Sequence, residues 1–201
     1  MLAKPAARWA ARFGAEKLIY SPFGLPLHHD APANHPKVRE LLDLVLWSEE
    51  HVWFSPEQHG AMPAVFKAQI GWVPLTIGAI RPTQGKTLAV MQGCGGSQSF
   101  NAVNQLRALG RWMRMFIIPN HSSMPKAYLA FDDQDRMKTS ASYDRVVNVM
   151  EELVKFTLLL REWPDLVDRY SEGKETAEEL SKRVNKRSIR NWSMVPTARV
   201  S

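Results

Sequence analysis

Residues 36–50, PKVRELLDLVLWSEE, place apolar side chains at the spacing of one helix face. The positions i, i+3, i+4, i+7 and i+8 match the period of an α-helix with one buried side. Asn34 can cap this helix, and Pro36 is tolerated in its first turn. The pattern therefore predicts an amphipathic helix whose buried side is formed by five residues: Val38, Leu41, Leu42, Val45 and Leu46.

Shorter apolar runs predict strands. KTLAVMQ (86–92) has a continuous apolar centre, which is typical of a strand buried on both faces of a parallel sheet. Runs rich in β-branched and aromatic residues predict three further strands: EKLIYSP (16–22), ending near Tyr20, HVWFSP (51–56) and MFIIPN (115–120).

Helical patterns separate these strands. They cover MLAKPAARWAARFG at the start, residues 61–74, residues 97–114 with Ser97 or Ser99 as cap, and residues 141–163. Such alternation predicts a parallel sheet covered by helices on both sides. Ligands bind beyond the carboxyl ends of the strands in such sheets. The loops SPEQHGA and QGCGGSQS follow two of the strands, so we expect one site shared by both.

Composition is that of a soluble globular protein, with 45% hydrophobic and 23% charged residues. No apolar run approaches the roughly 18 residues that span a bilayer, which excludes a membrane protein. The single cysteine is consistent with a reducing, cytoplasmic environment.

The net charge of +6 is confined to the C-terminal tail. Residues 181–201 contain six basic and no acidic side chains, whereas the rest of the chain has 20 of each. Because the charges of residues 1–180 cancel, this part of the chain lacks the excess of basic residues with which nucleic-acid-binding proteins contact phosphates. We therefore expect a solvated tail rather than one that contacts nucleic acid or a partner subunit.

Residues 91–100, MQGCGGSQSF, contain glycines at a spacing that fits no nucleotide-binding motif. The Walker pattern lacks its lysine and its serine or threonine, and Gln98 interrupts a GxGxxG fingerprint. Glycines before a helix nevertheless leave backbone N–H groups exposed, and these groups can donate hydrogen bonds to the electron-rich atoms at the edge of a ligand. Cys94 is alone, which excludes a zinc or iron–sulfur site and makes a catalytic thiol improbable.

Other polar side chains allow two interpretations each. Glu57 and His59 form either an acid–base pair or a turn that shapes a pocket, and we favour the turn because no GxSxG nucleophile accompanies them. Arg107, Arg111 and Arg114 share one helix face. We favour a solvated or subunit-facing stripe there over recognition of a cosubstrate phosphate. The scarcity of acid–base groups favours an enzyme whose reactive atoms belong to a bound cofactor.

Several long stretches resemble the arsenical-resistance flavoproteins of ArsH type, within the NADPH-dependent FMN reductases. They include GLPLHHDAP, HPKVRELLDLVLWSE, SPEQHGAM, RPTQGKTLAVMQ and GGSQSFNAVNQLRALGRWMRM, and with YDRVVNVMEELVKFTLL they cover most of residues 15–172. The resemblance implies a flavodoxin-like α/β three-layer sandwich over residues 1–163. It also implies FMN as cofactor, NADPH as donor, a homotetramer, and quinones, azo dyes, metal ions or organoarsenicals as acceptors. The composition of residues 164–201 itself predicts a charged helical extension and a basic tail.

The resemblance also selects site residues. One loop would lie beside the isoalloxazine ring, and a second would supply backbone contacts at the ring's other edge. No side chain of this chain is expected to be catalytic. The first loop comprises Ser55, Pro56, Glu57, Gln58, His59, Gly60 and Ala61, and the second comprises Cys94, Gly95 and Gly96.

Three departures from the family pattern stand out. Gln58 replaces a usual arginine, and Cys94 replaces a usual serine. The family also begins with a strand and a phosphate-binding loop, whereas Met1 falls inside what would be the first helix. That central strand would contribute roughly 6–15 kcal/mol of burial, so we expect the functional protein to extend upstream. The alternative is a degenerate, non-enzymatic family member that acts through oligomer contacts or its basic tail.

Overall fold

The computed structural model describes residues 2–28, 30–75, 77, 81–162, 176, 178–179 and 181–182. The chain divides into two units, Met1–Val167 and Asp168–Ser201. In the second unit, Thr176 and Glu179 cap a short helical stretch by exchanging side-chain-to-backbone hydrogen bonds. Most of the predicted helical extension and basic tail lies outside the described residues.

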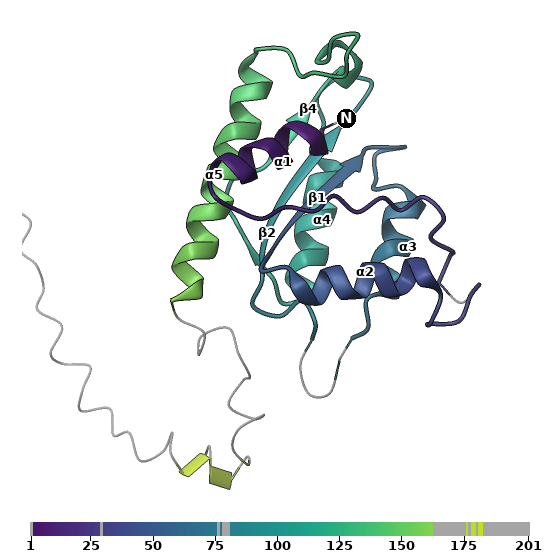
Figure 1. Ribbon diagram of the computed structural model, residues 1–201, viewed down its shortest axis with the longest axis vertical. Coiled ribbons are helices and arrows are strands. Elements are labelled where there is room, and N and C mark those ends of the chain that lie inside the picture. The colour runs from purple at the N-terminus through teal and green to yellow at the C-terminus, as the bar shows by residue number, and fades with distance from the viewer. Residues whose placement is uncertain are drawn as a thin grey trace, which may run out of the picture. The chain divides into compact units, whose positions relative to one another are not determined.

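The first unit alternates helices with parallel strands (Figure 1). Strand β2 (Thr87–Gly93) pairs with β1 (Glu50–Pro56) on one side. On its other side it pairs with β3 (Phe116–Ile117) and then with β4 (Ser122–Met124). Among the described residues no helix is both long and apolar enough to cross a membrane. The elements are α1 (Ala3–Arg12), α2 (Pro36–Trp47), β1 (Glu50–Pro56), α3 (Ala64–Trp72), β2 (Thr87–Gly93), α4 (Asn101–Trp112), β3 (Phe116–Ile117), β4 (Ser122–Met124), the 3₁₀ turn η1 (Ala127–Leu129) and α5 (Ala141–Arg161).

Strand β2 is the centre of the sheet and is buried on both faces. Ala89 and Met91 pack in one cluster with α1 and α5. Leu88 and Val90 pack in a second cluster with α3 and α4. Helices therefore cover both faces, which confirms the predicted parallel sheet with a doubly buried strand.

Helix α1 lies across α5 on one side of the sheet (Figure 1). Ala6 and Ala10 are buried against the sheet cluster, and small side chains let the two helices approach closely. The Trp9 indole Nε1 donates a hydrogen bond of 3.0 Å to the Tyr143 hydroxyl, which joins α1 to the first turn of α5.

The predicted strand at residues 16–22 is not formed. Residues 16–20 lie alongside β1 across a hollow of about 350 Å³. No main-chain hydrogen bond connects them to β1 within the described part of the chain, and a strand requires such a ladder. The central strand predicted upstream of Met1 would have to lie between residues 16–20 and β1. That strand stays a prediction.

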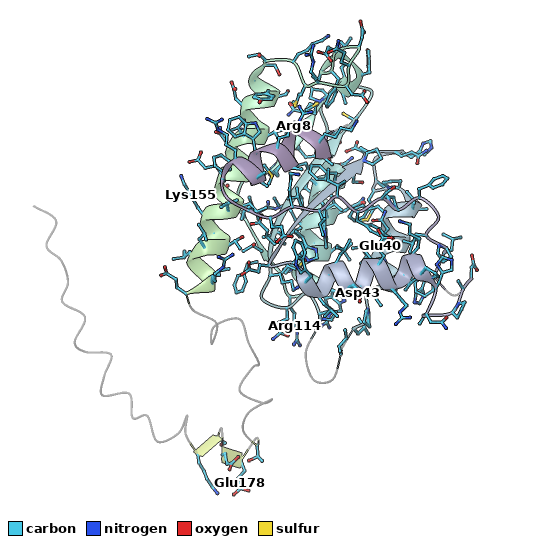
Figure 2. All side chains as sticks on the ribbon, viewed as in Figure 1. Arg8, Glu40, Asp43, Arg114, Lys155 and Glu178 are labelled. Atoms are coloured by element: carbon cyan, nitrogen blue, oxygen red, sulfur yellow. The ribbon has the colours of Figure 1, made fainter. Side chains whose placement is uncertain are left out.

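The amphipathic helix α2 is confirmed, with two corrections. His35 rather than Asn34 caps it, because the imidazole Nδ1 accepts a hydrogen bond of 3.3 Å from the Lys37 N–H. Leu46 is 52% exposed and is not part of the buried face. Glu40 and Asp43 lie on its polar side (Figure 2).

Of the strand predicted at residues 115–120, only β3 (Phe116–Ile117) forms, and β4 begins beyond that range at Ser122. Pro119 has no N–H and cannot donate to a strand ladder. The next N–H, that of Asn120, donates to the Glu152 carboxylate of α5 at 3.1 Å. The chain therefore leaves the sheet between the two short strands.

Gly110 is the point where α4 approaches the sheet most closely. A Cβ at this position would overlap Leu88 Cδ2 and lie 3.3 Å from Ile117 Cδ1. We expect Gly110→Ala to lower the free energy of unfolding by about 1–3 kcal/mol, because overpacking outweighs the gain in helix propensity. Urea denaturation followed by circular dichroism measures this change.

Gly71 of α3 provides the matched control. A Cβ there would lie 3.4 Å from the His28 Cβ, an ordinary contact. Gly71→Ala should leave stability unchanged or raise it by up to about 1 kcal/mol. Equal effects of the two substitutions would contradict the close approach at Gly110.

Candidate cofactor site

The two loops selected from the sequence lie together at the carboxyl edge of the sheet. Strands β1 and β2 run parallel in register, with Ser55 opposite Gln92 and Pro56 opposite Gly93. The Glu57 N–H then donates a hydrogen bond of 3.0 Å to the Gly93 carbonyl. Residues 55–61 and 94–96 therefore emerge side by side, as the strand order predicts for a ligand site.

Residues 58–61 form a tight two-residue turn. Gln58 and Ala61 exchange backbone hydrogen bonds of 2.9 and 3.0 Å. The residues between them, His59 and Gly60, have φ angles of 51° and 71°, as in a type I′ turn. Both are exposed, and within the described residues their N–H groups make no hydrogen bond. The turn thus presents two backbone donors to a ligand.

Glu57 anchors this turn to the N-terminus of α4. Its carboxylate accepts hydrogen bonds from Gln92 Nε2 at 2.8 Å and from the Ala102 N–H at 3.3 Å. Partial desolvation acts to raise the pKa of Glu57, but hydrogen bonds from Ser99, Gln92 and the backbone of Ala102 and Asn101 outweigh it and lower the pKa. An ionised carboxylate with these partners holds the loop in place, which favours the turn over an acid–base pair with His59.

Gln92 is the residue of this site that the sequence analysis missed. It is fully buried, and its Nε2 donates to Glu57 Oε2 at 2.8 Å and to the Ser99 carbonyl at 2.7 Å. Its Oε1 accepts from the Val103 N–H at 2.8 Å. A single amide thus joins β2 to both loops and to α4. The available signal was the one polar side chain that ends the apolar run LAVMQ.

The second loop is held by backbone hydrogen bonds to the segment after β4. Cys94 N–H donates to the Met124 carbonyl at 3.0 Å, and the Lys126 N–H donates to the Gly96 carbonyl at 3.1 Å. The Cys94 thiol is half-buried and lies 3.2 Å from the Ser97 carbonyl, a position where a serine hydroxyl would serve equally as donor. Cys94 therefore has a structural role in the loop.

Gly95 and Gly96 have the exposure that a backbone-binding site needs. Within the described residues their N–H groups make no hydrogen bond, and a Cβ on either would meet nothing within 4 Å. Ser55, by contrast, is 3% exposed and its hydroxyl donates to the Pro56 carbonyl. Both loops therefore present backbone N–H donors that can hydrogen-bond to the polar edges of a planar ring. The residues of the two loops fit a flavin.

The arginine stripe predicted on α4 includes Arg107 and Arg111 but not Arg114, because the helix ends at Trp112. Arg114 follows the helix with a φ of 61°, and its guanidinium donates to Gln84 Oε1 at 3.1 Å. Arg107 donates to the carbonyls of Ile118 and Pro119 at 3.1 and 3.3 Å. Arg107 thus satisfies carbonyl groups where the chain leaves the sheet.

Comparison with known proteins identifies the family. The family model described as NADPH-dependent FMN reductase matches residues 1–128. The chain belongs to this family. It is 66% identical, over 190 residues, to the NADPH-dependent FMN reductase ArsH of Acidithiobacillus ferrooxidans, a match that covers 94% of this chain and 80% of the relative. The resemblance to the ArsH proteins is thereby confirmed.

Solved structures confirm the flavodoxin-like fold. The flavoenzyme NAD(P)H:(acceptor) oxidoreductase FerB of Paracoccus denitrificans aligns with a TM-score of 0.61 at 19% identity, over 79% of this chain and 88% of FerB. A flavodoxin from Archaea aligns with a TM-score of 0.52 at 11% identity, over 78% and 88% of the two chains. At these identities the similarity concerns the fold alone. Family membership makes the chain an oxidoreductase that uses FMN and NADPH.

The buried amide of Gln92 is open to a direct test. Gln92→Leu leaves Glu57 and the Val103 N–H without their partner, at about 1–3 kcal/mol for each unsatisfied buried group. We expect a loss of stability of that order and an increase of about tenfold in the Kd for FMN, measured by flavin fluorescence titration. Gln134→Leu, the same change at an exposed loop position, should alter neither quantity.

Gln92→Glu separates loop positioning from simple packing. The introduced carboxylate would lie against Glu57, and the two like charges would favour protonation of one of them. FMN binding should then become stronger as the pH falls, whereas binding by the unmodified chain lacks this dependence. A pH-independent Kd in this variant would argue against the contact with Glu57.

Proposed function

We propose that the chain transfers reducing equivalents from NADPH through FMN to a small-molecule acceptor such as a quinone, an azo dye, a metal ion or an organoarsenical. The observation that supports this most directly is the pair of loops joined by Gln92 and Glu57. Both loops present unbonded backbone N–H groups at the carboxyl edge of the sheet, where a flavin ring fits.

The protein's part in the reaction is to bind and orient. When bound, FMN would supply the two-electron redox chemistry that links oxidation of NADPH to reduction of the acceptor. The N–H groups of His59, Gly60, Gly95 and Gly96 would donate hydrogen bonds to the polar edges of the ring and so orient it. Hydride transfer depends on such positioning, because the reacting atoms must lie about 3–3.5 Å apart.

The ten residues selected from the sequence serve this site in different ways. The exposed turn 58–61 and the pair Gly95–Gly96 would contact the ring, whereas Ser55 and Glu57 hold the first loop in place through their hydrogen bonds. Gln58, in the place of an arginine, makes the ring's surroundings less positive. Because the donors are backbone groups, the changes at positions 58 and 94 are compatible with flavin binding.

Several further properties belong to the same proposal. They are a cytoplasmic location, a homotetramer, and a division into residues 1–163 and 164–201. The phosphate-binding loop expected upstream of Met1 also stays a prediction. Arsenic chelation by thiols is not part of the proposal, because one cysteine cannot chelate As(III) by itself. The non-enzymatic alternative is not favoured, given the close relationship to a reductase.

The proposal predicts that purified protein binds FMN, shows a flavin spectrum, and oxidises NADPH in a reaction that requires both FMN and an acceptor. Absorbance at the NADPH band measures the rate. Protein that gains no FMN on titration, or that oxidises no NADPH with FMN bound, would contradict it.

Gly95→Leu tests the site within the same assay. A Cβ at this position meets nothing within 4 Å, so stability should be unchanged, while the leucine would occupy the space assigned to the ring. We expect FMN affinity to fall by about tenfold or more, with an unchanged Tm for the FMN-free protein. Unaltered FMN affinity would place the flavin elsewhere.

A further inference from the structure

A second hollow, of about 360 Å³, lies beside the cofactor loops. It lies between β4, the residues before β4, and the first turns of α5, which packs against β4 (Figure 1). Gln98 and Ser123 form its boundary with the second cofactor loop, and the Ser123 hydroxyl donates to the Ser99 carbonyl. A ligand in this hollow would therefore reach toward the flavin site.

Among the described residues that line this hollow, Arg145 is the one cationic side chain. Arg145 lies in its wall and donates one hydrogen bond of 3.0 Å to Asn120 Oδ1, which leaves other guanidinium N–H groups for a ligand. Desolvation, together with the charges of Arg107 and Arg145, lowers the pKa of His121, which lines the same wall. Within the described chain the lining contains no carboxylate, and the nearby Glu152 is bonded to the Asn120 N–H.

The N-terminus of α5 contributes to the same wall. Ser140 caps this helix of 21 residues, and Ala141 and Ser142 of its first turn line the hollow. Helix N-termini favour anions through their free N–H groups and their dipole. Arginine, imidazole and serine donors thus face the same space as the helix end.

Two rings line the hollow and offer an apolar surface. Phe100 and His121 meet edge to face with their centroids 5.7 Å apart, and Phe100 is 45% exposed. Aromatic edges and faces of this kind pack against a purine. The hollow thus combines anion-binding groups with a surface for an adenine ring.

We propose that this hollow binds the adenosine half of NADPH and that Arg145 holds its 2′-phosphate. This inference depends on the proposed function, since it concerns the donor of the same reaction. The 2′-phosphate is a dianionic group that NADH lacks, so the charge of Arg145 would select NADPH over NADH. Arginine suits this role because its planar fork pairs two N–H groups with phosphate oxygens.

Direct binding provides the first test. Calorimetry with adenosine 2′,5′-bisphosphate should detect binding to the FMN-loaded protein, with a Kd at least tenfold higher in Arg145→Gln. Binding of adenosine 5′-monophosphate should be the same in both proteins. Absence of bisphosphate binding, or equal binding to both proteins, would overturn the assignment.

Ser142→Asp provides a second test, in which an added negative charge should repel the ligand phosphate without destabilising the fold. A carboxylate in the first turn of α5 stabilises the helix while it repels a phosphate. The bisphosphate Kd should rise, with an unchanged or higher Tm. Lys155→Gln is the matched control, because it makes the same one-unit change in charge on the exposed side of α5 (Figure 2). This position lies about 20 Å from Ser142 along the helix axis.

Steady-state kinetics separates this inference from the proposed function. In Arg145→Gln the ratio of kcat/KM for NADPH to that for NADH should fall by about tenfold, through KM for NADPH, with kcat and the Kd for FMN unchanged. An unchanged ratio, or equal losses with both nucleotides, would overturn the role of Arg145 while leaving the reductase activity intact. Inactivity of the unmodified chain with both donors would instead contradict the proposed function.

Discussion

The buried amide of Gln92 is the interaction on which the candidate site depends. It lies where the apolar strand β2 ends, and its three hydrogen bonds reach the carboxylate of Glu57, the carbonyl of Ser99 and the N–H of Val103. Moving either loop would leave buried polar groups unpaired, which costs more than an ordinary hydrogen bond contributes. Two loops from different parts of the chain therefore act as one surface.

This arrangement explains why the site needs few reactive side chains. The sheet positions the loops, Gln92 and Glu57 join them, and the turn with His59 and Gly60 presents backbone donors. A flavin brings its own reactive atoms, so the protein contributes orientation and hydrogen bonds. Side chains on the exposed loops can then vary, as at Gln58, without altering the geometry of the backbone.

Sequence patterns predicted elements well where the burial pattern is local. The face of α2 and the doubly buried β2 follow from residue spacing alone, and both are confirmed. The strand at residues 16–22 was wrong because a strand exists only with a neighbour to hydrogen-bond, and propensity carries no information about that neighbour. The strand predicted at residues 115–120 was too long because it included Pro119, which cannot donate to a strand ladder, and the structure places β4 against the same side of β2 after Pro119.

The sequence by itself determined the parallel α/β class, the two loops at the strand ends, and the resemblance to the flavin reductases. These follow from hydrophobic periodicity and from motifs that are contiguous in the chain. Only the tertiary structure decided that Gln92 joins the two loops, that Glu57 is an anchor rather than a base, and that Arg145 and His121 line the same hollow. These interactions join residues from different secondary-structure elements and loops. Their spacing along the sequence follows neither the helix period nor the strand period, so no sequence pattern predicts them.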